Sequence, residues 1–198
     1  MDVAASNLKR RRFLLASTAA LGTVAAGGAA APFFLGMLPG ARARAAGAPV
    51  EVDLSGIEPG MLLRTEWRGM PVWVLHRTQP MLDSLASTDG MVVDPHSEYS
   101  MQPAYCRSEY RSIRLPWLVV IAICTHLGCI PLVDLSPGPA SGLGPDWPGG
   151  FFCPCHGSKY DLAGRVFKDM PAPRNLSVPR YAFAADTRLT IGADEHGS

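Results

Sequence analysis

The chain has 198 residues with eighteen Lys and Arg against seventeen Asp and Glu, a formal net charge of +1; this length allows one domain with an appendage and excludes a large multidomain catalyst. The near balance of charge leaves no basic field of the kind that nucleic-acid-binding proteins use, so we expect no nucleic-acid partner. Hydrophobic residues make up 47% of the chain and charged residues 18%, which excludes intrinsic disorder, and twenty glycines with eighteen prolines favour a loop-rich β protein.

An uncharged segment of 29 residues, from Phe13 to Ala41, follows a basic N-terminus. As a helix it is long enough to cross the roughly 30 Å hydrocarbon core of a bilayer. We therefore predict a retained transmembrane anchor over residues 13–38; a cleaved secretory signal ending near residue 43 is the alternative. The basic residues 9–12 precede the span, so the positive-inside rule places residues 1–12 in the cytoplasm and the rest of the chain outside.

The basic residues also form a pattern of their own, because Arg10, Arg11 and Arg12 are followed by Phe13 and Leu14. This order is typical of a twin-arginine export signal, and a plain charge cluster that sets topology is the alternative. Residues 39–49 have no apolar periodicity and are predicted to be a flexible hinge linker. The predicted location is a bacterial inner membrane, crossed once, with residues 50–198 forming a periplasmic domain.

Short apolar runs with turn signals between them dominate the rest of the chain. We expect strands at residues 50–54, 61–67, 71–77, 115–123, 181–183 and 188–191. A short helix is expected after Thr78, with Pro80 in its first turn and an apolar face behind it. Residues 162–165 are expected to form a hairpin turn, residues 87–114 a surface insertion, and the Gly/Pro-rich residues 136–150 a loop.

Four of the five cysteines and two of the five histidines lie in two short segments, Cys124-Thr125-His126-Leu127-Gly128-Cys129 and Cys153-Pro154-Cys155-His156-Gly157-Ser158. Each segment offers one Cys and one His that could converge on a metal, and it leaves a second cysteine spare. The glycine in each segment allows close approach of the backbone to a ligand, and the proline stiffens the second segment.

Three kinds of site are compatible with these residues. Two cysteines and two histidines suit tetrahedral zinc, although their order differs from that of a zinc finger. Four cysteines could form two disulfides outside the cytoplasm, which would leave both histidines without a role. The third is a [2Fe-2S] cluster with Cys on one iron and His on the other.

Both segments match the Rieske iron-sulfur family at its fixed positions, and the chain resembles the Rieske subunits of quinol:cytochrome c reductase, the cytochrome bc complex. The resemblance extends to the anchor, to residues 50–53, 57–60 and 67–69, and to Pro171-Ala172-Pro173, so it covers nearly the whole chain. It implies a mainly antiparallel β Rieske fold, with a base β-sandwich, a smaller cluster-binding subdomain at about residues 120–175, and one N-terminal transmembrane helix.

The resemblance also implies one Rieske [2Fe-2S] cluster. Cys124 and Cys153 would bind one iron, and His126 and His156 the other. The spare cysteines, Cys129 and Cys155, would form a disulfide. Ser158 and Tyr160 would donate hydrogen bonds to a bridging sulfide and to a cysteine sulfur.

Histidine ligands change what such a cluster does. Replacing two thiolates by neutral imidazoles changes the formal charge of the oxidised cluster from −2 to 0, and the potential moves from about −400 mV toward about −150 to +300 mV. Hydrogen-bond donors near the sulfurs favour the reduced state further. Each imidazole also keeps a second nitrogen that can gain or lose a proton, so electron uptake can be coupled to proton uptake.

The function implied by the resemblance is electron transfer from membrane quinol to a c-type haem subunit, coupled to proton release, within a dimeric complex that also contains a cytochrome b subunit. His156 would accept a hydrogen bond from quinol, Leu127 would form part of an apolar docking tip, and the domain would swing on residues 39–49. The alternatives are the small Rieske subunit of another exported oxidoreductase such as arsenite oxidase, a soluble dioxygenase ferredoxin, and a structural zinc module.

Two features depart from the family pattern. Met170 stands where a glycine usually opens the proline-rich segment, and residues 135–149 are longer than the family leads us to expect, which makes them a candidate for a subunit contact.

Cys106 has no family role and is expected to be a buried small hydrophobe. The other histidines, His76, His96 and His196, have no partner at ligand spacing.

Overall fold

The computed structural model describes residues 3–40, 47–99 and 101–194. They form two compact units, divided between residues 45 and 46, and each is described by itself. Residues 41–46 of the predicted hinge lie outside the described residues, so the hinge stays a prediction.

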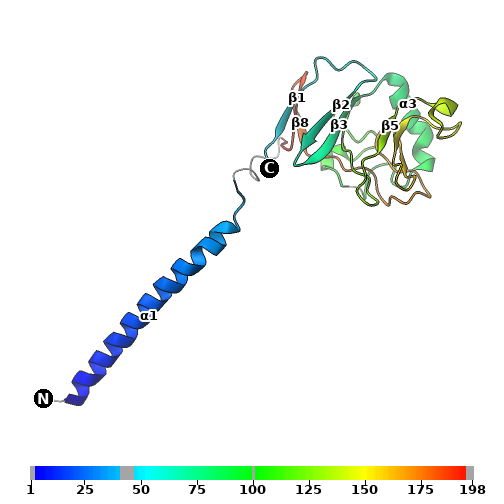
Figure 1. Ribbon diagram of the computed structural model, residues 1–198. Coiled ribbons are helices and arrows are strands. Elements are labelled where there is room, and N and C mark those ends of the chain that lie inside the picture. The colour runs from blue at the N-terminus through cyan, green and yellow to red at the C-terminus, as the bar shows by residue number, and fades with distance from the viewer. Residues whose placement is uncertain (1–2, 41–46, 100, 195–198) are drawn as a thin grey trace. The chain divides into compact units, whose positions relative to one another are not determined.

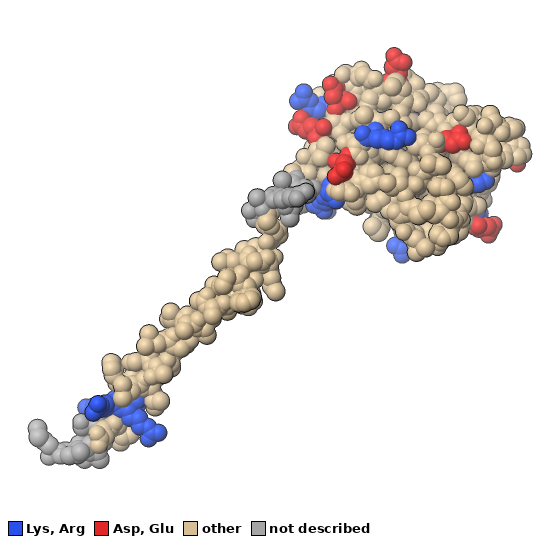
Figure 2. All heavy atoms as spheres, viewed as in Figure 1, with Lys and Arg blue, Asp and Glu red and all other residues tan. Residues whose placement is uncertain are grey.

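The first unit is a single long helix, α1 (Val3–Gly36), shown in blue in Figure 1. Its 30 residues from Asn7 to Gly36 are long and apolar enough to cross a membrane, with a length of about 45 Å at 1.5 Å per residue. Figure 2 shows basic side chains gathered at the N-terminal end of this helix and uncharged side chains along the rest. The charge asymmetry used to predict its orientation is therefore a property of the folded helix.

Within its described residues, the second unit contains three antiparallel sheets of three strands each. In the first, β1 (Val50–Asp53) pairs with β9 (Arg188–Ile191), which pairs with β8 (Tyr181–Ala185). The second has the order β2 (Leu62–Trp67), β3 (Met70–His76), β4 (Trp117–Ile121). The third has the order β5 (Leu132–Asp134), β6 (Gly150–Phe152), β7 (Lys159–Tyr160). The predicted mainly antiparallel β fold with one N-terminal helix is confirmed.

The predicted helix is also present as α3 (Gln79–Thr88). The Thr78 hydroxyl accepts a hydrogen bond from the Met81 backbone N–H at its start, and Leu82 and Leu85 are buried on its apolar face. Short 3-10 helices cover Asp89–Met91, Ala104–Cys106 and Gly138–Ser141.

The core is centred on β3, in which four consecutive residues, Val72 to Leu75, are buried. A strand that is apolar on both faces has to be covered on both sides. The ring of Trp73 lies 5.1 Å from the ring of Phe151 on β6 and so joins the second sheet to the third. This contact ties the segments that carry the cysteines to the main core.

The prediction of a surface insertion at residues 87–114 is wrong for a minority of the segment, because most of its described residues are exposed or half-buried but several are buried. Val92, Asp94, Ser97, Cys106 and Arg111 are all buried. Polar residues hide this burial from the sequence, because hydrogen bonds satisfy them inside the fold; the carboxylate of Asp94, for example, accepts the backbone N–H of Glu98 at 2.8 Å.

The Gly/Pro-rich residues 136–150 form mostly a loop, as predicted, apart from the 3-10 turn and the first residue of β6. Trp147 from this loop packs with Val92 and Phe167 in a small apolar cluster beside the main core. The rings of Trp147 and Phe167 lie 6.1 Å apart. The loop is thus anchored by one aromatic side chain.

Candidate metal centre

The first cysteine segment, residues 124–129, forms a tight loop that we call the first loop. The Cys124 N–H donates to the Cys129 carbonyl at 2.8 Å, and the Gly128 N–H donates back to the Cys124 carbonyl at 3.0 Å. Gly128 has a φ of 85°, in the region that glycine adopts without a steric penalty. β4 ends at Ile121, so the buried sheet delivers Cys124 to this loop.

The second cysteine segment, residues 153–158, forms the second loop, which is closed by the same two backbone hydrogen bonds. The Cys153 N–H donates to the Ser158 carbonyl at 2.8 Å, and the Gly157 N–H donates to the Cys153 carbonyl at 2.9 Å. Gly157 has a φ of 81°. β6 and β7 flank this loop, so a hairpin of the third sheet presents it.

The two cysteines that open the loops, Cys124 and Cys153, are buried free thiols. Burial raises the pKa of Cys124, but hydrogen bonds from the Tyr160 hydroxyl, the His126 backbone and neighbouring side chains outweigh it, so its pKa lies below the ordinary value. Burial also raises the pKa of Cys153, and the adjacent Cys124 sulfur raises it further. Deprotonating both neighbouring thiols costs free energy, because it places two negative charges close together in a buried site. A bound cation would offset that cost.

The two histidines of the loops face one another. The rings of His126 and His156 lie 4.7 Å apart, edge to face. Among the described residues, Nδ1 of His126 is buried and has no hydrogen-bond partner. Leaving a buried nitrogen unpaired is costly, and a metal ligand bond would satisfy it.

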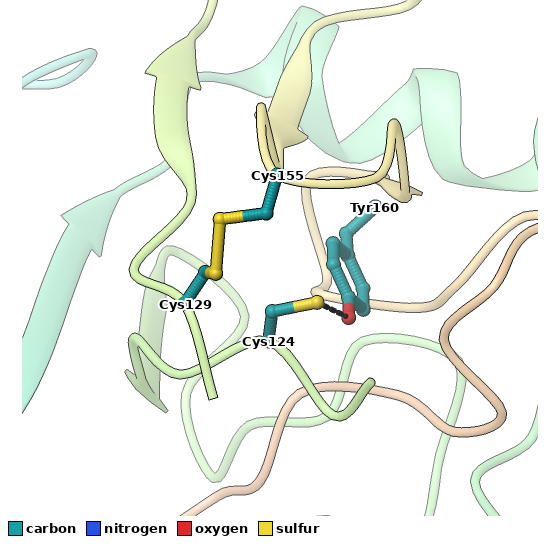
Figure 3. Close-up of a disulfide and its surroundings, with 4 residues drawn as sticks. All are labelled: Cys124, Cys129, Cys155 and Tyr160. Carbon is teal, nitrogen blue, oxygen red and sulfur yellow. Dashed lines mark hydrogen bonds between the residues drawn. A yellow bond between two sulfur atoms is a disulfide. The ribbon is translucent and has the colours of Figure 1, made fainter. Parts of the chain in front are cut away.

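A disulfide joins the loops between Cys129 and Cys155, as Figure 3 shows. The pairing implied by the resemblance is therefore present in the structure. The sulfurs of Cys129, Cys153 and Cys155 lie within 4.8 Å of one another. They do not make a three-thiolate metal site, because the disulfide takes two of them.

The hydroxyl of Tyr160 donates a hydrogen bond to the sulfur of Cys124 at 3.2 Å (Figure 3). The Ser158 side chain also forms a hydrogen bond that lowers the pKa of Cys124, and its Oγ accepts the Ala172 N–H at 3.0 Å. Both side chains are fully buried. The structure thus places the two predicted donors against a predicted ligand.

Thr125 is a residue of the site that our sequence analysis missed. Its N–H donates to the Tyr160 hydroxyl at 3.2 Å, and its own hydroxyl donates to the Arg174 carbonyl at 2.6 Å. It therefore connects the first loop both to Tyr160 and to the proline-rich segment. Its position between two predicted ligands was the available signal.

The proline-rich segment covers the loops although Met170 replaces the usual glycine. The Met170 side chain packs against the main core and against the small cluster around Trp147. The segment keeps its contacts with the loops through Ala172 and Arg174. The departure at residue 170 therefore adds packing and does not remove the cover.

The outer surface of the loops carries exposed apolar side chains and an exposed imidazole. Leu127 is 71% exposed, and Ile130 and Leu132 just beyond it are also exposed. His156 is exposed in the second loop. Exposed apolar side chains grouped in this way are typical of a docking surface.

These observations test whether the residues fit a [2Fe-2S] cluster. Two buried free sulfurs and one unpaired imidazole nitrogen lie in loops that also bring the second imidazole close. The donor set of two sulfurs and two nitrogens suits the histidine-ligated form of that cluster. The residues present fit the group.

The remaining cysteine and histidines lie outside the two loops, and Cys106 and His76 have structural contacts. Cys106 is buried, with its sulfur 3.6 Å from the Tyr181 hydroxyl. Nδ1 of His76 lies 2.7 Å from the Ile57 carbonyl, and its ring stacks on Trp117. His96 is exposed, and His196 lies outside the described residues.

Comparison with known proteins agrees with this geometry. Residues 107–182 match the family model described as "Rieske [2Fe-2S] domain", and residues 1–39 match the one described as "Ubiquitinol-cytochrome C reductase Fe-S subunit TAT signal". The chain is 55% identical over 194 residues to the "Ubiquinol-cytochrome c reductase iron-sulfur subunit" of Allochromatium vinosum, covering 98% of this chain and 93% of that one. The subunits of the same name from Blastochloris viridis and Bradyrhizobium diazoefficiens are 45% and 44% identical, over 93% and 92% of this chain and 93% and 94% of theirs.

Proposed function

The chain belongs to the family of ubiquinol-cytochrome c reductase iron-sulfur subunits, and from this premise we propose how its own residues oxidise quinol within that oxidoreductase complex. Its Rieske domain gives it the electron-transfer role in the complex. The arsenite oxidase alternative has no support among these relatives.

When bound, a Rieske cluster accepts one electron at a raised potential. We assign Cys124 and Cys153 to one iron, and His126 and His156 to the other. The two thiols are buried and adjacent, which keeps water from the sulfurs. The unpaired Nδ1 of His126 supports its assignment as a ligand.

His156 is proposed to accept a hydrogen bond from the quinol hydroxyl at the ring nitrogen that does not bind iron. The observation that carries this proposal is the exposure of His156, whose ring lies 4.7 Å from the ring of His126, the residue that precedes the exposed Leu127. An imidazole at the surface can take a proton as an electron enters the protein. Leu127 and its apolar neighbours would exclude water while quinol is bound.

Ser158 and Tyr160 are proposed to favour the reduced state. Tyr160 donates to the sulfur of Cys124, and a donor stabilises the additional negative charge that reduction places on that sulfur. Ser158 acts in the same direction from the second loop.

The anchor and the family support a proposal for the surrounding assembly. We propose that α1 spans a bacterial inner membrane with residues 1–12 in the cytoplasm, as the basic residues at its N-terminal end support. The partners would be a cytochrome b subunit and a c-type haem subunit in a dimeric complex. Residues 39–49 would serve as the hinge that carries the periplasmic domain between them.

Replacing Leu127 by Asp tests the docking tip. A carboxylate at a surface that has to lose water on docking is costly, so we expect quinol oxidation by the assembled complex to fall at least about tenfold, equivalent to about 1.4 kcal/mol. The cluster signal in electron paramagnetic resonance should be unchanged. Met61→Asp is the matched control, since Met61 is also exposed but lies beside β2; an unchanged rate in Leu127→Asp would refute the docking role.

A further inference from the structure

Three arginine side chains are fully buried around one short turn, residues 161–165, which we call the arginine-held turn. They are Arg77, Arg111 and Arg165, the three largest fully buried side chains among the described residues. The turn is closed by hydrogen bonds between the backbones of Asp161 and Arg165 and from Gly164 to Asp161. It begins directly after Tyr160, the donor to the sulfur of Cys124.

Arg165 has the partners expected of a buried charge. Its Nε donates to Asp161 Oδ2 at 2.7 Å, and one terminal nitrogen donates to Asp89 Oδ1 at 2.6 Å. The other terminal nitrogen donates to the Leu85 carbonyl and the Thr88 hydroxyl at the end of α3. The ion pair with Asp161 therefore closes the turn, and the hydrogen bonds to Leu85 and Thr88 join it to the helix.

Arg77 is different, because its hydrogen-bond partners are neutral. Its guanidinium donates to the carbonyls of Tyr110, Leu115 and Leu162 and to the Ser112 hydroxyl. The contact with the turn is the bond to Leu162, at 3.3 Å. Burial lowers the pKa of Arg77 to about 10, which shows that the charge is held at a cost.

Arg111 continues the pattern along the turn. One terminal nitrogen donates to the carbonyls of Ala163 at 3.0 Å and Gly164 at 3.2 Å, and the other donates to Leu176 at 2.5 Å. Its Nε is buried and has no hydrogen-bond partner among the described residues. Burial lowers the pKa of Arg111 to about 10 as well.

Three successive carbonyls, those of residues 162, 163 and 164, are therefore each bound by a buried guanidinium. Apolar side chains of similar volume often stabilise a fold as well as buried charged groups do, so stability alone is a poor explanation for two guanidiniums with neutral partners. A guanidinium presents its donors in a rigid fork. Such a fork can fix the direction of several carbonyls at once.

We propose that Arg77 and Arg111 are positioning residues, which hold the arginine-held turn by its carbonyls and thereby keep the Tyr160 hydroxyl on the sulfur of Cys124. The path is short, because Tyr160 immediately precedes the turn and its backbone pairs with Val166 immediately after it. This inference rests on the proposed role of Tyr160 as a donor that favours the reduced state.

The test compares reduction potentials of the full chain with its cluster, starting from Tyr160→Phe as the reference for a lost hydrogen bond. Arg111→Lys keeps the charge but cannot supply the fork, so we expect a downward shift smaller than that of Tyr160→Phe. In the Tyr160→Phe background, Arg111→Lys should lower the potential no further, since the hydrogen bond that it positions is already absent. Arg114→Lys is the matched control, because Arg114 is partly exposed and pairs with Asp186.

A merely structural role would lower the unfolding stability of Arg111→Lys and leave its potential at the wild-type value, and that result would overturn the proposal. An equal shift of the potential with and without Tyr160 would overturn it too, since the effect would then not pass through Tyr160. If Tyr160→Phe alone leaves the potential unchanged, the donor role fails and the inference fails with it.

Gly164→Ala provides a second variant in case Arg111→Lys does not fold. Gly164 has a φ of 70°, and a Cβ at this position would lie 3.2 Å from a terminal nitrogen of Arg111. The substitution disturbs the same contact with every charge retained. A lowered potential supports the positioning role, and a wild-type potential in this variant would overturn it.

Discussion

The first and second loops share one backbone design but distribute their side chains differently. Both open with a buried free cysteine, and both close with the same pair of backbone hydrogen bonds and a glycine of positive φ. When the loops are aligned on these bonds, Leu127 of the first corresponds to His156 of the second. Cys129 likewise corresponds to Ser158.

This difference in side chains explains how two loops with the same backbone can have different roles in one site. The first loop holds its histidine with a buried Nδ1 and exposes a leucine, whereas the second exposes its histidine and buries a serine beside the ligand sulfur. The shared cysteine position makes the site symmetric at the sulfurs. The shifted histidine position makes it asymmetric at the surface.

Removing either opening cysteine tests the shared part of the design and should have the largest effect. Cys124→Ser and Cys153→Ser each delete a sulfur ligand, so we expect complete loss of the cluster, measured as iron content and as the electron paramagnetic resonance signal. Cys106→Ser is the control, because Cys106 is equally buried but lies in neither loop. Retention of the full cluster in either loop variant would contradict the symmetric role.

The disulfide tests whether the loops depend on their covalent connection. It links residues 26 apart in sequence, and closure of a loop of that length contributes on the order of 3 kcal/mol in the chain-entropy model. We expect Cys129→Ser to retain the cluster and to lose about that much unfolding free energy in denaturant titrations. Total loss of iron would indicate instead that the sulfur of Cys129 is a ligand.

Replacing Ser158 tests the difference between the two loops, because the corresponding residue of the first loop is Cys129, which forms the disulfide. Ser158→Ala removes a donor that favours the reduced state, and we expect the midpoint potential to fall on the order of 50 mV, the equivalent of about one hydrogen bond. Redox titration followed by circular dichroism would measure it. A potential equal to that of the wild type would remove Ser158 from this role.

Replacing Thr125 should have the smallest effect of these substitutions. Thr125→Val deletes the hydroxyl that donates to the Arg174 carbonyl, so we expect a loss of about 1 kcal/mol in unfolding free energy and faster hydrogen exchange in the proline-rich segment. Thr187→Val, at an exposed position, is the control. Equal stability losses in both variants would show that the Arg174 contact contributes nothing.

The elements that could be predicted are those for which residues close together in the sequence form a recognisable pattern. Short apolar runs predict β2 and β3, Thr78 and Pro80 predict the start of α3, and the two cysteine segments predict the site. The strands β5 and β6 were missed because they are only three residues long. Their pairing depends on contacts that are distant in sequence.

The buried arginines could not be predicted for a related reason. Arg77 and Arg111 find their partners 85 and 52 residues away, at the carbonyls of the arginine-held turn. Nothing in the local sequence separates such a residue from a partly exposed one such as Arg114. Tertiary contacts decide the difference.

Mössbauer spectroscopy of the iron-loaded full chain tests the central claim most directly. The account predicts two inequivalent iron sites in equal amounts, one bound by the cysteines and one by the histidines. Two equivalent iron sites, or a purified protein that contains zinc and no iron, would contradict it.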